Sequence, residues 1–464
     1  MARSSKKIDM LSGSLWDKLI IFALPVAFTG IFQQLFNTAD VIVLGRFVSK
    51  EAMAAVGSNV PAIGLIISFC MGLALGANVV IARALGRRDP EEAGRGVHTA
   101  FALALIFGTA MMILGELLAV PTAELLGVPD SVMGHAVSYL RGFFVGLPFI
   151  AVYNFLAAAY RSQGDTQTPL WALVMASCIN AALDLFFVLV LGWGAGAVAL
   201  ATSIANMSAA LFLFLKLLRA EGPLRLYPER LFAVDRTALR TMVRIGWPAG
   251  LQGAVFSLSN LLIQSAINSL GPDVMAGSVA AFTIEINVYC FINAFGLACT
   301  TFVSQNYGAG QFARSRRVTR VAFGLNIAAT VMMVALVLAF GHQLLGFFSP
   351  SSEVIELGFV RLLWVVSAEP INVILEMLSG ALRAYGCSMP PAIVMLVAIC
   401  GVRIVYVFTV FAASPTYATL MTVYPISWVA AAAGLIVLYG RFMRRLEFRI
   451  RAREEEKLSA AAED

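Results

Sequence analysis

Two carboxyl side chains of this sequence, Asp40 and Asp184, lie within long apolar stretches where a charge is costly. An ionisable residue near the centre of a lipid bilayer costs at least about 2.5 kcal/mol, so such residues usually serve a function. Asn180 comes one helical turn before Asp184, which places both side chains on one face of a helix. Thr202 and Tyr139, from two further apolar stretches, could complete a hydrogen-bonded cluster around the two acids.

A buried cluster of this kind is suited to binding and releasing a cation. Desolvation and mutual repulsion disfavour two charged carboxylates at close range, so the pair could load a proton on one side of a membrane and release it on the other. A sodium ion could instead be coordinated by oxygens of Asp40, Asn180, Asp184 and Thr202. The sequence leaves proton and sodium open, and it also allows that either aspartate only caps a helix or joins two helices.

The stretch that carries Asp40 has two further features that bear on such a role. Gln34, Asn37 and Asp40 recur at intervals of three residues and form a polar stripe on an otherwise apolar helix. Pro25, earlier in the same stretch, lacks a backbone N–H and leaves one helical carbonyl without its usual partner. We expect a bend at Pro25, through which ion occupancy could be converted into helix movement.

Charged side chains also interrupt the apolar stretches of the second half of the chain, namely Glu285, Glu369, Glu376 and Arg403. Asn154 and Glu376 are 222 positions apart in a repeat described below, so we expect both to face a central cleft. Acidic side chains in a water-accessible cleft favour cationic substrates. The residues expected to line this cleft are Gln34, Asn37, Asn154, Glu285 and Glu376. Salt bridges of Glu369 or Glu376 with Arg403 are an equally open alternative.

The composition and hydropathy of the whole chain indicate an integral membrane protein. Of 464 residues, 59% are hydrophobic and 13% are charged, with a mean hydropathy of +0.83, whereas soluble domains carry about twice that share of charge. Apolar stretches of the roughly 20 residues that a helix needs to cross a bilayer recur along the chain. The short segments of alternating polarity that barrel strands would need are absent. The spans expected are 18–45, 53–82, 97–118, 133–160, 169–191, 195–216, 245–270, 277–304, 319–341, 355–382, 391–412 and 417–440.

An internal repeat relates the first six spans to the last six. Seven helix-breaking, polar or charged residues of the first half recur 222 or 223 positions later. The pairs are Pro25 with Pro248, Asn37 with Asn260, Gly86 with Gly308, Pro148 with Pro370, Arg161 with Arg383, Gly164 with Gly386, and Pro169 with Pro391. So many matches in one register indicate a duplicated six-helix unit.

The duplication predicts an all-α membrane protein of twelve transmembrane helices in two bundles. Because six is even, both halves enter the membrane in the same orientation and are related by a pseudo-twofold axis along the membrane normal. A cleft between the bundles would hold substrate and open alternately to the two sides. The predicted domains are an amino-terminal lobe at 1–216, a cytoplasmic linker at 217–244, a carboxy-terminal lobe at 245–440 and a charged cytoplasmic tail at 441–464.

The net charge of +6 is distributed as a topology signal. Lys and Arg cluster at alternate connections, which places those connections and both termini in the cytoplasm by the positive-inside rule. We therefore expect no nucleic-acid partner. Arg161 and Arg383 lie three residues before Gly164 and Gly386 at two helix ends, and we expect them to contact helix carboxy-termini or lipid headgroups.

Motifs for catalysis are absent from the sequence. There is no Walker-type phosphate loop, no G-x-S-x-G, no HExxH and no paired set of Cys and His. The six cysteines show no CxxC spacing and fall mostly within apolar spans, where they act as small buried hydrophobes. We expect no enzymatic activity and no cofactor, only a coupling proton or sodium ion.

Three segments together resemble the multidrug and toxic compound extrusion (MATE) family. They are the 25–40 stretch, the sequence YRSQGDT from Tyr160 to Thr166 and the sequence SQNYGAG from Ser304 to Gly310. With the duplicated plan, the resemblance covers roughly positions 12 to 445, and within the family it is similar to the DinF-type prokaryotic branch. It implies that Pro25 is the bending proline. It also implies a role in coupling transport to protons or sodium for Asp40, Tyr139, Asn180, Asp184 and Thr202.

The other prokaryotic branch of that family, the NorM type, places essential acids in helices seven and ten. Helix seven of this chain has no acid and offers Gln252, Phe256 and Ser257 on the relevant stretch. Helix ten offers Asn372, with Glu376 a turn later. A sodium site in the carboxy-terminal lobe is therefore not expected, although Glu376 could still serve substrate binding.

The leading hypothesis is a secondary active antiporter that exports amphipathic, cationic organic compounds from a prokaryotic cell. It would be a monomeric, multi-pass protein of the cytoplasmic (inner) membrane whose partners are drugs or metabolites and membrane lipids. The alternative is a lipid or lipid-linked saccharide flippase of the same superfamily. Flippases of this kind usually hold a diphosphate in a basic cavity, so several arginines in the cleft would favour that alternative.

Overall fold

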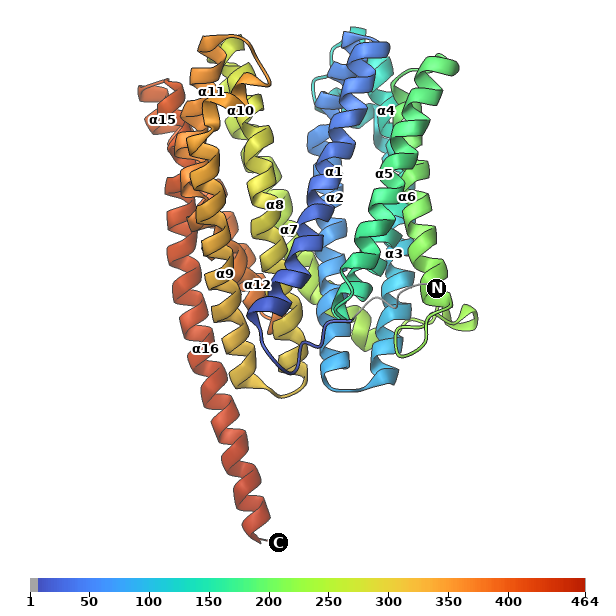
Figure 1. The fold of residues 1–464 in the computed structure, drawn as a ribbon, viewed down its shortest axis with the longest axis vertical. Helices are drawn as coiled ribbons and strands as arrows, with labels where there is room; N and C mark the ends of the chain where they lie inside the picture. The colour runs from blue at the N-terminus through green and yellow to red at the C-terminus, as the bar shows by residue number, and fades with distance from the viewer. Residues whose placement is uncertain (1–6, 464) are drawn as a thin grey trace.

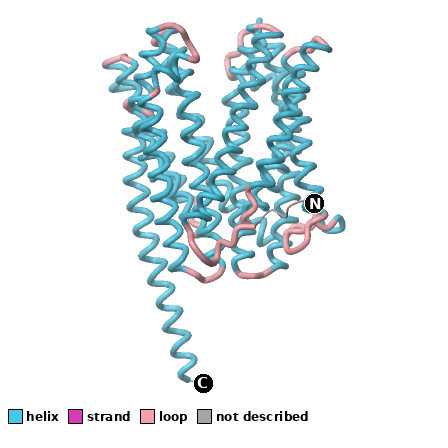
Figure 2. The backbone as a smooth tube through the Cα atoms, viewed as in Figure 1, coloured by secondary structure: helices cyan, strands magenta, loops and turns pink. Residues whose placement is uncertain are grey.

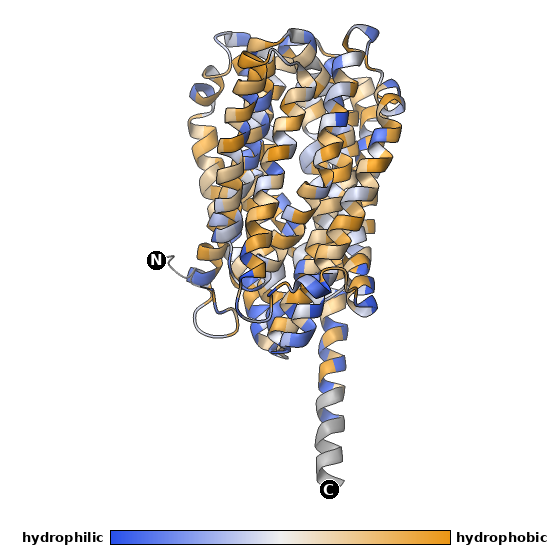
Figure 3. Cartoon of the chain, turned by 90° about the vertical axis from the view of Figure 1, so that its right-hand side faces the viewer, coloured by the Kyte–Doolittle hydropathy of each residue, from blue (hydrophilic) through white to orange (hydrophobic). Residues whose placement is uncertain are grey.

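The computed structural model describes residues 7–463, and over that range the chain is helical, with no strand. Loops lie mostly at the two ends of a helix bundle (Figure 2). Apolar residues dominate the length of the bundle, and hydrophilic residues are most frequent at its ends (Figure 3). Ten of the described helical segments are long and apolar enough to cross a membrane. The fold is therefore that of a multi-pass membrane protein.

Six long helices form the amino-terminal lobe. They are α1 (Trp16–Phe47), α2 (Lys50–Gly86), α3 (Pro90–Leu125), α4 (Asp130–Ser162), α5 (Gln167–Leu185), which continues as the π-helical turn η1 (Phe186–Val190), and α6 (Ala195–Leu218). The connection to the second lobe contains a single short turn, η2 (Pro228–Arg230). Residue 218, where α6 ends, lies two positions beyond the predicted end of this lobe.

The carboxy-terminal lobe repeats this plan in shorter pieces, and α8, α9, α11, α13 and α15 each begin 222 residues after α2, α3, α4, α5 and α6. Its elements are α7 (Arg236–Asn268), α8 (Pro272–Gly308), α9 (Phe312–Ala339), α10 (Gly341–Gly346), α11 (Ser352–Trp364), η3 (Val366–Ala368), α12 (Glu369–Ala384), α13 (Met389–Met395), η4 (Leu396–Gly401), α14 (Val402–Tyr406), η5 (Val407–Phe411), α15 (Tyr417–Met421) and α16 (Val423–Glu463). α7 begins inside the predicted linker because Asp235 caps its first turn, accepting from the Ala238 N–H at 2.8 Å.

Two predicted spans, 245–270 and 355–382, are not among the ten that qualify by length and apolarity. α7 covers the first, and its polar residues, such as Gln252, Ser259 and Asn260, lower its hydropathy. The second is divided into α11 and α12 by η3, directly before Pro370, which cannot donate a hydrogen bond to the preceding turn. Both segments lie inside the bundle beside the apolar helices (Figure 1), so the two-lobe plan of twelve spans holds.

The lobes contact each other through their first and second helices. α2 packs against α7, and a Cβ atom added at Gly72 would overlap the backbone of Gly250, so both helices approach closely because of glycine. α1 packs against α8, where the rings of Phe22 and Phe302 meet edge to face with centroids 5.5 Å apart. The second half of α1, with Asp40, instead contacts α5 and α6 of its own lobe. α1 therefore links the two lobes.

A symmetric pair of hydrogen bonds joins the lobes at one end of the bundle. Arg83 of α2 donates to the carbonyl of Ala384 at the end of α12, at 2.6 Å from Nη2. Gln305 of α8, 222 residues after Arg83, donates to the carbonyl of Ser162 at the end of α4, also at 2.6 Å. We call these four residues the tail-end latch, because the helices converge at the end from which α16 projects and diverge toward the other end (Figure 1).

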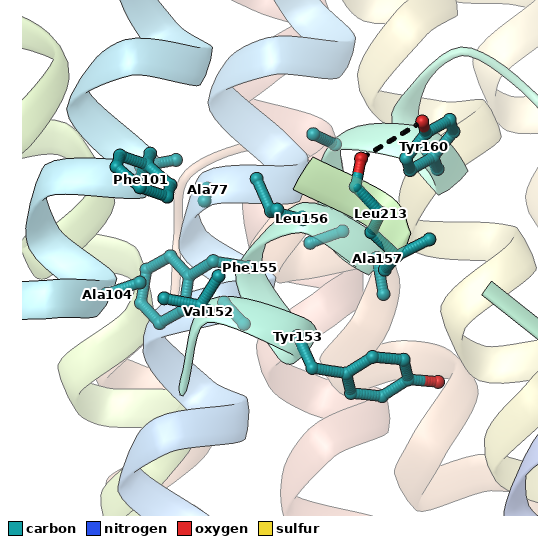
Figure 4. Packing of buried hydrophobic residues seen from close by; sticks show 14 of the residues in the cluster. Ala77, Phe101, Ala104, Val152, Tyr153, Phe155, Leu156, Ala157, Tyr160 and Leu213 are labelled. Carbon is teal, nitrogen blue, oxygen red and sulfur yellow. Dashed lines mark hydrogen bonds between the residues drawn. The ribbon is translucent and has the colours of Figure 1, made fainter. Parts of the chain in front are cut away.

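The core of the amino lobe is built from small and aromatic side chains of α4 packed on its neighbours (Figure 4). Phe155 lies among Ala77 of α2 and Phe101 of α3, and all three are almost fully buried. At the next turn, the Tyr160 hydroxyl donates to the carbonyl of Leu213 on α6 at 3.4 Å. This packing holds the last turn of α4 in place against the rest of the lobe.

Candidate functional site

Four of the predicted site residues meet inside the amino lobe, where α1, α5 and α6 converge. Asp40 is 2% exposed and Asp184 is fully buried. The Thr202 hydroxyl donates to Asp40 Oδ2 at 2.9 Å, and the two carboxyl groups lie within hydrogen-bonding reach of each other. Asn180 lies between them on α5. Packing thus brings together side chains that are up to 162 positions apart in the sequence.

The amide of Asn180 connects the two carboxyl groups. With its nitrogen turned toward them, it donates to Asp40 Oδ1 at 3.1 Å and to Asp184 Oδ2 at 3.2 Å. Asp184 Oδ1 is buried and has no hydrogen-bond partner. Within residues 7–463, neither acid forms a salt bridge. A buried acceptor oxygen without a donor is costly, so this position is suited to a proton or a small cation.

The other residues proposed for the amino lobe are placed differently. Tyr139 of α4 is 7% exposed and lies near enough to interact electrostatically with both aspartates. Gln34 is half-buried and Asn37 is exposed. α1 runs as a continuous helix through Pro25, whose carbonyl accepts a hydrogen bond from the Thr29 hydroxyl at 2.8 Å.

A cavity of about 390 Å³ lies between the lobes, and it is separate from this acid cluster. α2 and α4 supply one wall, and α7, α8, α12, α14 and α16 supply the other. Asn154, Glu285 and Glu376 lie on its wall, whereas Gln34 and Asn37 do not. Aromatic side chains of the carboxy lobe complete the lining, so the cavity combines apolar surface with a few charged groups.

Two of the three glutamates that line this cavity, Glu285 and Glu376, have arginine partners. Glu285 Oε2 accepts from Arg361 Nε at 2.8 Å. Glu376 accepts from the Tyr289 hydroxyl at 3.2 Å, and its second carboxylate oxygen lies 3.8 Å from Arg383 Nη2. Glu285 and Glu376 are thus compensated by fixed positive charges, unlike the acid pair of the amino lobe.

Arg403 takes part in neither of the salt bridges that were considered for it. It donates to Asn260 Oδ1 at 2.9 Å and to Ser427 Oγ at 3.3 Å, and its guanidinium lies 4.5 Å from the centre of the Tyr424 ring. Glu369 accepts from Asn372 Nδ2 at 3.0 Å. The contacts of Arg403 are therefore with neutral groups.

Sequence reasoning missed the arginine that pairs with Glu285 and the position of two arginines in the cavity wall. Arg361 was not singled out, although it is the repeat counterpart of Tyr139, 222 positions later, and this register could have revealed it. Arg161 and Arg383 were expected only at helix ends, but both also line the cavity.

Among residues 7–463, no group of three or more His, Cys, Asp or Glu comes together to hold a metal ion. A cation in the acid cluster would depend on two carboxylates and neutral oxygens.

Two helical lobes with a cavity between them are the architecture of a membrane transporter. A family model described as MatE matches residues 25–186 and again residues 248–409, more than half of the chain. The two matches are offset by 223 residues, as the repeat is. The chain belongs to the MatE family, whose members are transporters rather than enzymes.

Relatives and solved structures agree with this family. The chain is 26% identical over 445 residues to the probable multidrug resistance protein YoeA of Bacillus subtilis (strain 168), covering 92% of this chain and 94% of the relative. It is 24% identical to the FAD transporter of Shewanella oneidensis, covering 83% of this chain and 86% of the relative. The crystal structure of a MATE transporter in complex with MaL6 has a TM-score of 0.87 at 22% identity, covering 95% of this chain and 98% of that one.

Proposed function

We propose that the protein exports amphipathic organic compounds in exchange for protons or sodium ions. The observation that carries this proposal is the acid cluster, in which Asp40 and Asp184 are buried together and have no cationic partner among residues 7–463. A proton or sodium ion bound between them would relieve their repulsion and draw α1 toward α5. Because the first half of α1 packs against α8, such a movement would alter the contact between the lobes.

The chemical character of the cavity supports an amphipathic substrate. Phe256, Phe282 and Trp428 offer aromatic surface, and charged groups stand beside them. Cationic compounds would be attracted by Glu285 and Glu376, as the sequence predicts. Both glutamates are paired with arginines, so the selection for positive charge is weaker than their number alone indicates.

The charge of the connections supports an orientation with the tail end in the cytoplasm. The turns after α2 and α8 lie at that end, and basic residues flank both, among them Arg87, Arg88, Arg314 and Arg316. In this orientation both termini would lie in the cytoplasm. The protein would be a monomer of the prokaryotic inner membrane, in contact with lipids, and would need no cofactor besides the coupling ion. The tail-end latch would close the cytoplasmic side, so the structure would correspond to an outward-open state.

Transport in proteoliposomes tests the proposal. Ethidium transport is followed under a pH gradient alone and then under a sodium gradient alone. We expect one of the two gradients to drive transport, and Asp184→Asn to remove that dependence. Equal ethidium movement with and without each gradient would contradict an antiport mechanism.

A second candidate function, the flipping of a lipid or a lipid-linked saccharide, is favoured by one observation. Arg161, Arg383 and Arg403 all line the cavity, and a basic cavity suits a diphosphate group. Drug susceptibility of a host lacking its own pumps, with and without this gene, separates the two functions. Resistance to dyes supports export, whereas unchanged susceptibility to many compounds supports the flippase.

A further inference from the structure

The side chain of Arg161 faces the interlobe cavity without a partner. It lines the cavity from the last turn of α4. Within residues 7–463 its guanidinium forms no hydrogen bond and no salt bridge, and its Nε is buried and unsatisfied. A guanidinium offers five N–H donors in a planar fork, and leaving a buried donor such as this Nε without an acceptor is costly.

Arg161 is not needed to complete the end of α4, which is the role that its sequence position suggested. The carbonyls of Tyr160 and Arg161 accept backbone N–H groups from the turn that follows. The carbonyl of Ser162 accepts the amide of Gln305 in the tail-end latch. Gly164, with a φ of +87°, allows the chain to leave the helix in this way. The guanidinium is therefore available for another partner.

The repeat shows what Arg161 lacks. Its counterpart Arg383 donates to Gln252 Oε1 at 3.1 Å and lies 3.8 Å from Glu376, seven residues earlier on the same helix. Seven residues before Arg161 the chain has Asn154, which uses its amide to donate to its own helix at 2.8 Å. The amino lobe therefore carries the arginine of this pair without the acid. Arg383 also keeps a buried, unsatisfied Nε.

Charge is unevenly distributed along the cavity. Arg161 and Arg383 lie in the last turns of α4 and α12, close to the tail-end latch. Glu369 lies at the first residue of α12, 14 positions before Arg383, which is about 21 Å along a helix. Glu376 lies between them. The part of the cavity near the latch therefore carries two arginines, whereas the far part holds Glu285 and Glu369 together with Arg403.

We propose that Arg161 and Arg383 form a subsite for a phosphate-type oxyanion carried by an amphipathic organic substrate. One arginine comes from each lobe, so a phosphate group with three accessible oxygens accepts from both sides at once. The apolar part of the substrate lies against the aromatic side chains of the carboxy lobe. This subsite rests on the proposed function, because it takes the cavity as the place where the exported compound binds.

Binding of two matched probes tests the subsite. Flavin mononucleotide and riboflavin share one ring system and differ by a phosphate, and fluorescence anisotropy follows their binding to the full chain in phosphatidylcholine nanodiscs. We expect flavin mononucleotide to bind at least about tenfold more tightly than riboflavin. Arg161→Gln removes this preference, and Asn154→Glu also removes it by supplying the missing carboxylate. Arg141→Gln, a change on the same helix outside the cavity, leaves it unaltered.

Two results would overturn the subsite. One is equal affinity of the wild-type protein for the two probes, and the other is an unchanged preference in both Arg161→Gln and Asn154→Glu. The assay needs no ion gradient, so an Arg161-dependent preference without gradient-driven ethidium transport leaves the subsite standing while the exporter proposal fails. Nanodiscs containing phosphatidylglycerol identify the source of the phosphate: competition that depends on Arg161 indicates a lipid headgroup, and its absence indicates a soluble compound.

Discussion

The acid pair of the amino lobe and two glutamates of the carboxy lobe are buried under opposite conditions. In the amino lobe, Asp40 and Asp184 share one cluster with amide and hydroxyl groups only. In the carboxy lobe, Glu285 and Glu376 lie 2.8 and 3.8 Å from arginine nitrogens. An acid paired with a fixed cation keeps its charge, whereas an unpaired couple changes greatly in energy when a proton or cation binds. The comparison supports ion exchange at the acid pair of the amino lobe and a permanent charge at Glu285 and Glu376. Glu369, which is buried beside Asn372 and forms no salt bridge within residues 7–463, belongs to neither group.

The repeat locates where the lobes diverged. The residue 222 positions after Tyr139 is Arg361, and the residue 222 positions after Thr202 is Tyr424. In the carboxy lobe these two side chains contact each other, with the Arg361 guanidinium 5.4 Å from the centre of the Tyr424 ring. One lobe thus holds a cation at the place where the other holds a phenol. The positions equivalent to Asp40 and Asp184 hold Ile263 and Tyr406, so the carboxy lobe has this cation and lacks the acid pair.

The largest expected effect comes from neutralising either aspartate. Asp40→Asn and Asp184→Asn each abolish gradient-driven efflux in proteoliposomes, because one amide cannot exchange a proton or repel the remaining carboxylate. Membrane insertion stays normal, since an amide is cheaper to bury than a carboxylate. Asp130→Asn, at the exposed start of α4, serves as the matched control and pumps normally. Normal pumping by both cluster variants would rule out their role in coupling.

The next largest effect is expected from Tyr139→Arg, which gives the amino lobe the cation found at the equivalent place in the other lobe. A fixed positive charge beside Asp40 and Asp184 keeps both acids charged, so they stop exchanging ions. We expect ion-driven efflux to fall at least about tenfold, roughly 1.4 kcal/mol in the barrier. Tyr139→Phe keeps the shape without the charge and should retain most of the activity. If the two variants behave alike, charge at this position does not separate the lobes.

Glu285→Gln tests the carboxy lobe, where this acid is paired with Arg361. It leaves Arg361 buried without its partner, which typically costs about 3 kcal/mol or more of stability. We expect a lower melting temperature of the purified protein with no change in which ion drives transport. The double variant Glu285→Gln with Arg361→Gln should recover part of the loss. A changed ion dependence in Glu285→Gln would place coupling chemistry in the carboxy lobe as well.

The smallest effect is expected at the tail-end latch, which both lobes share. Gln305→Ala removes the hydrogen bond to the Ser162 carbonyl, worth about 1 kcal/mol, while the repeat-related bond of Arg83 remains. We expect a shift of a few fold toward a state open at the tail end, measured as faster labelling of a cysteine placed at position 158 in the cavity wall. Gln264→Ala, an exposed change on α7, is the control and should label at the wild-type rate.

Much of the candidate site could be anticipated from the sequence. Asp40 and Asp184 stood out because a carboxyl group in an apolar span has few structural uses. Asn154 and Glu376 were linked by the repeat, and both line the cavity. The pairing of the glutamates could not be anticipated, because Arg361 lies near the end of a short amphipathic helix and its direction depends on how that helix is rotated.

Hydropathy and linear spacing are enough to establish a membrane protein, twelve spans and a duplicated six-helix unit, because these properties do not depend on which helices touch. The contacts that each charged residue makes cannot be established in this way. Asp40 reaches Thr202, Glu285 reaches Arg361, and Arg161 reaches no partner at all within residues 7–463. These outcomes follow from the tilt and rotation of packed helices, and the spacing of residues along one chain does not specify either.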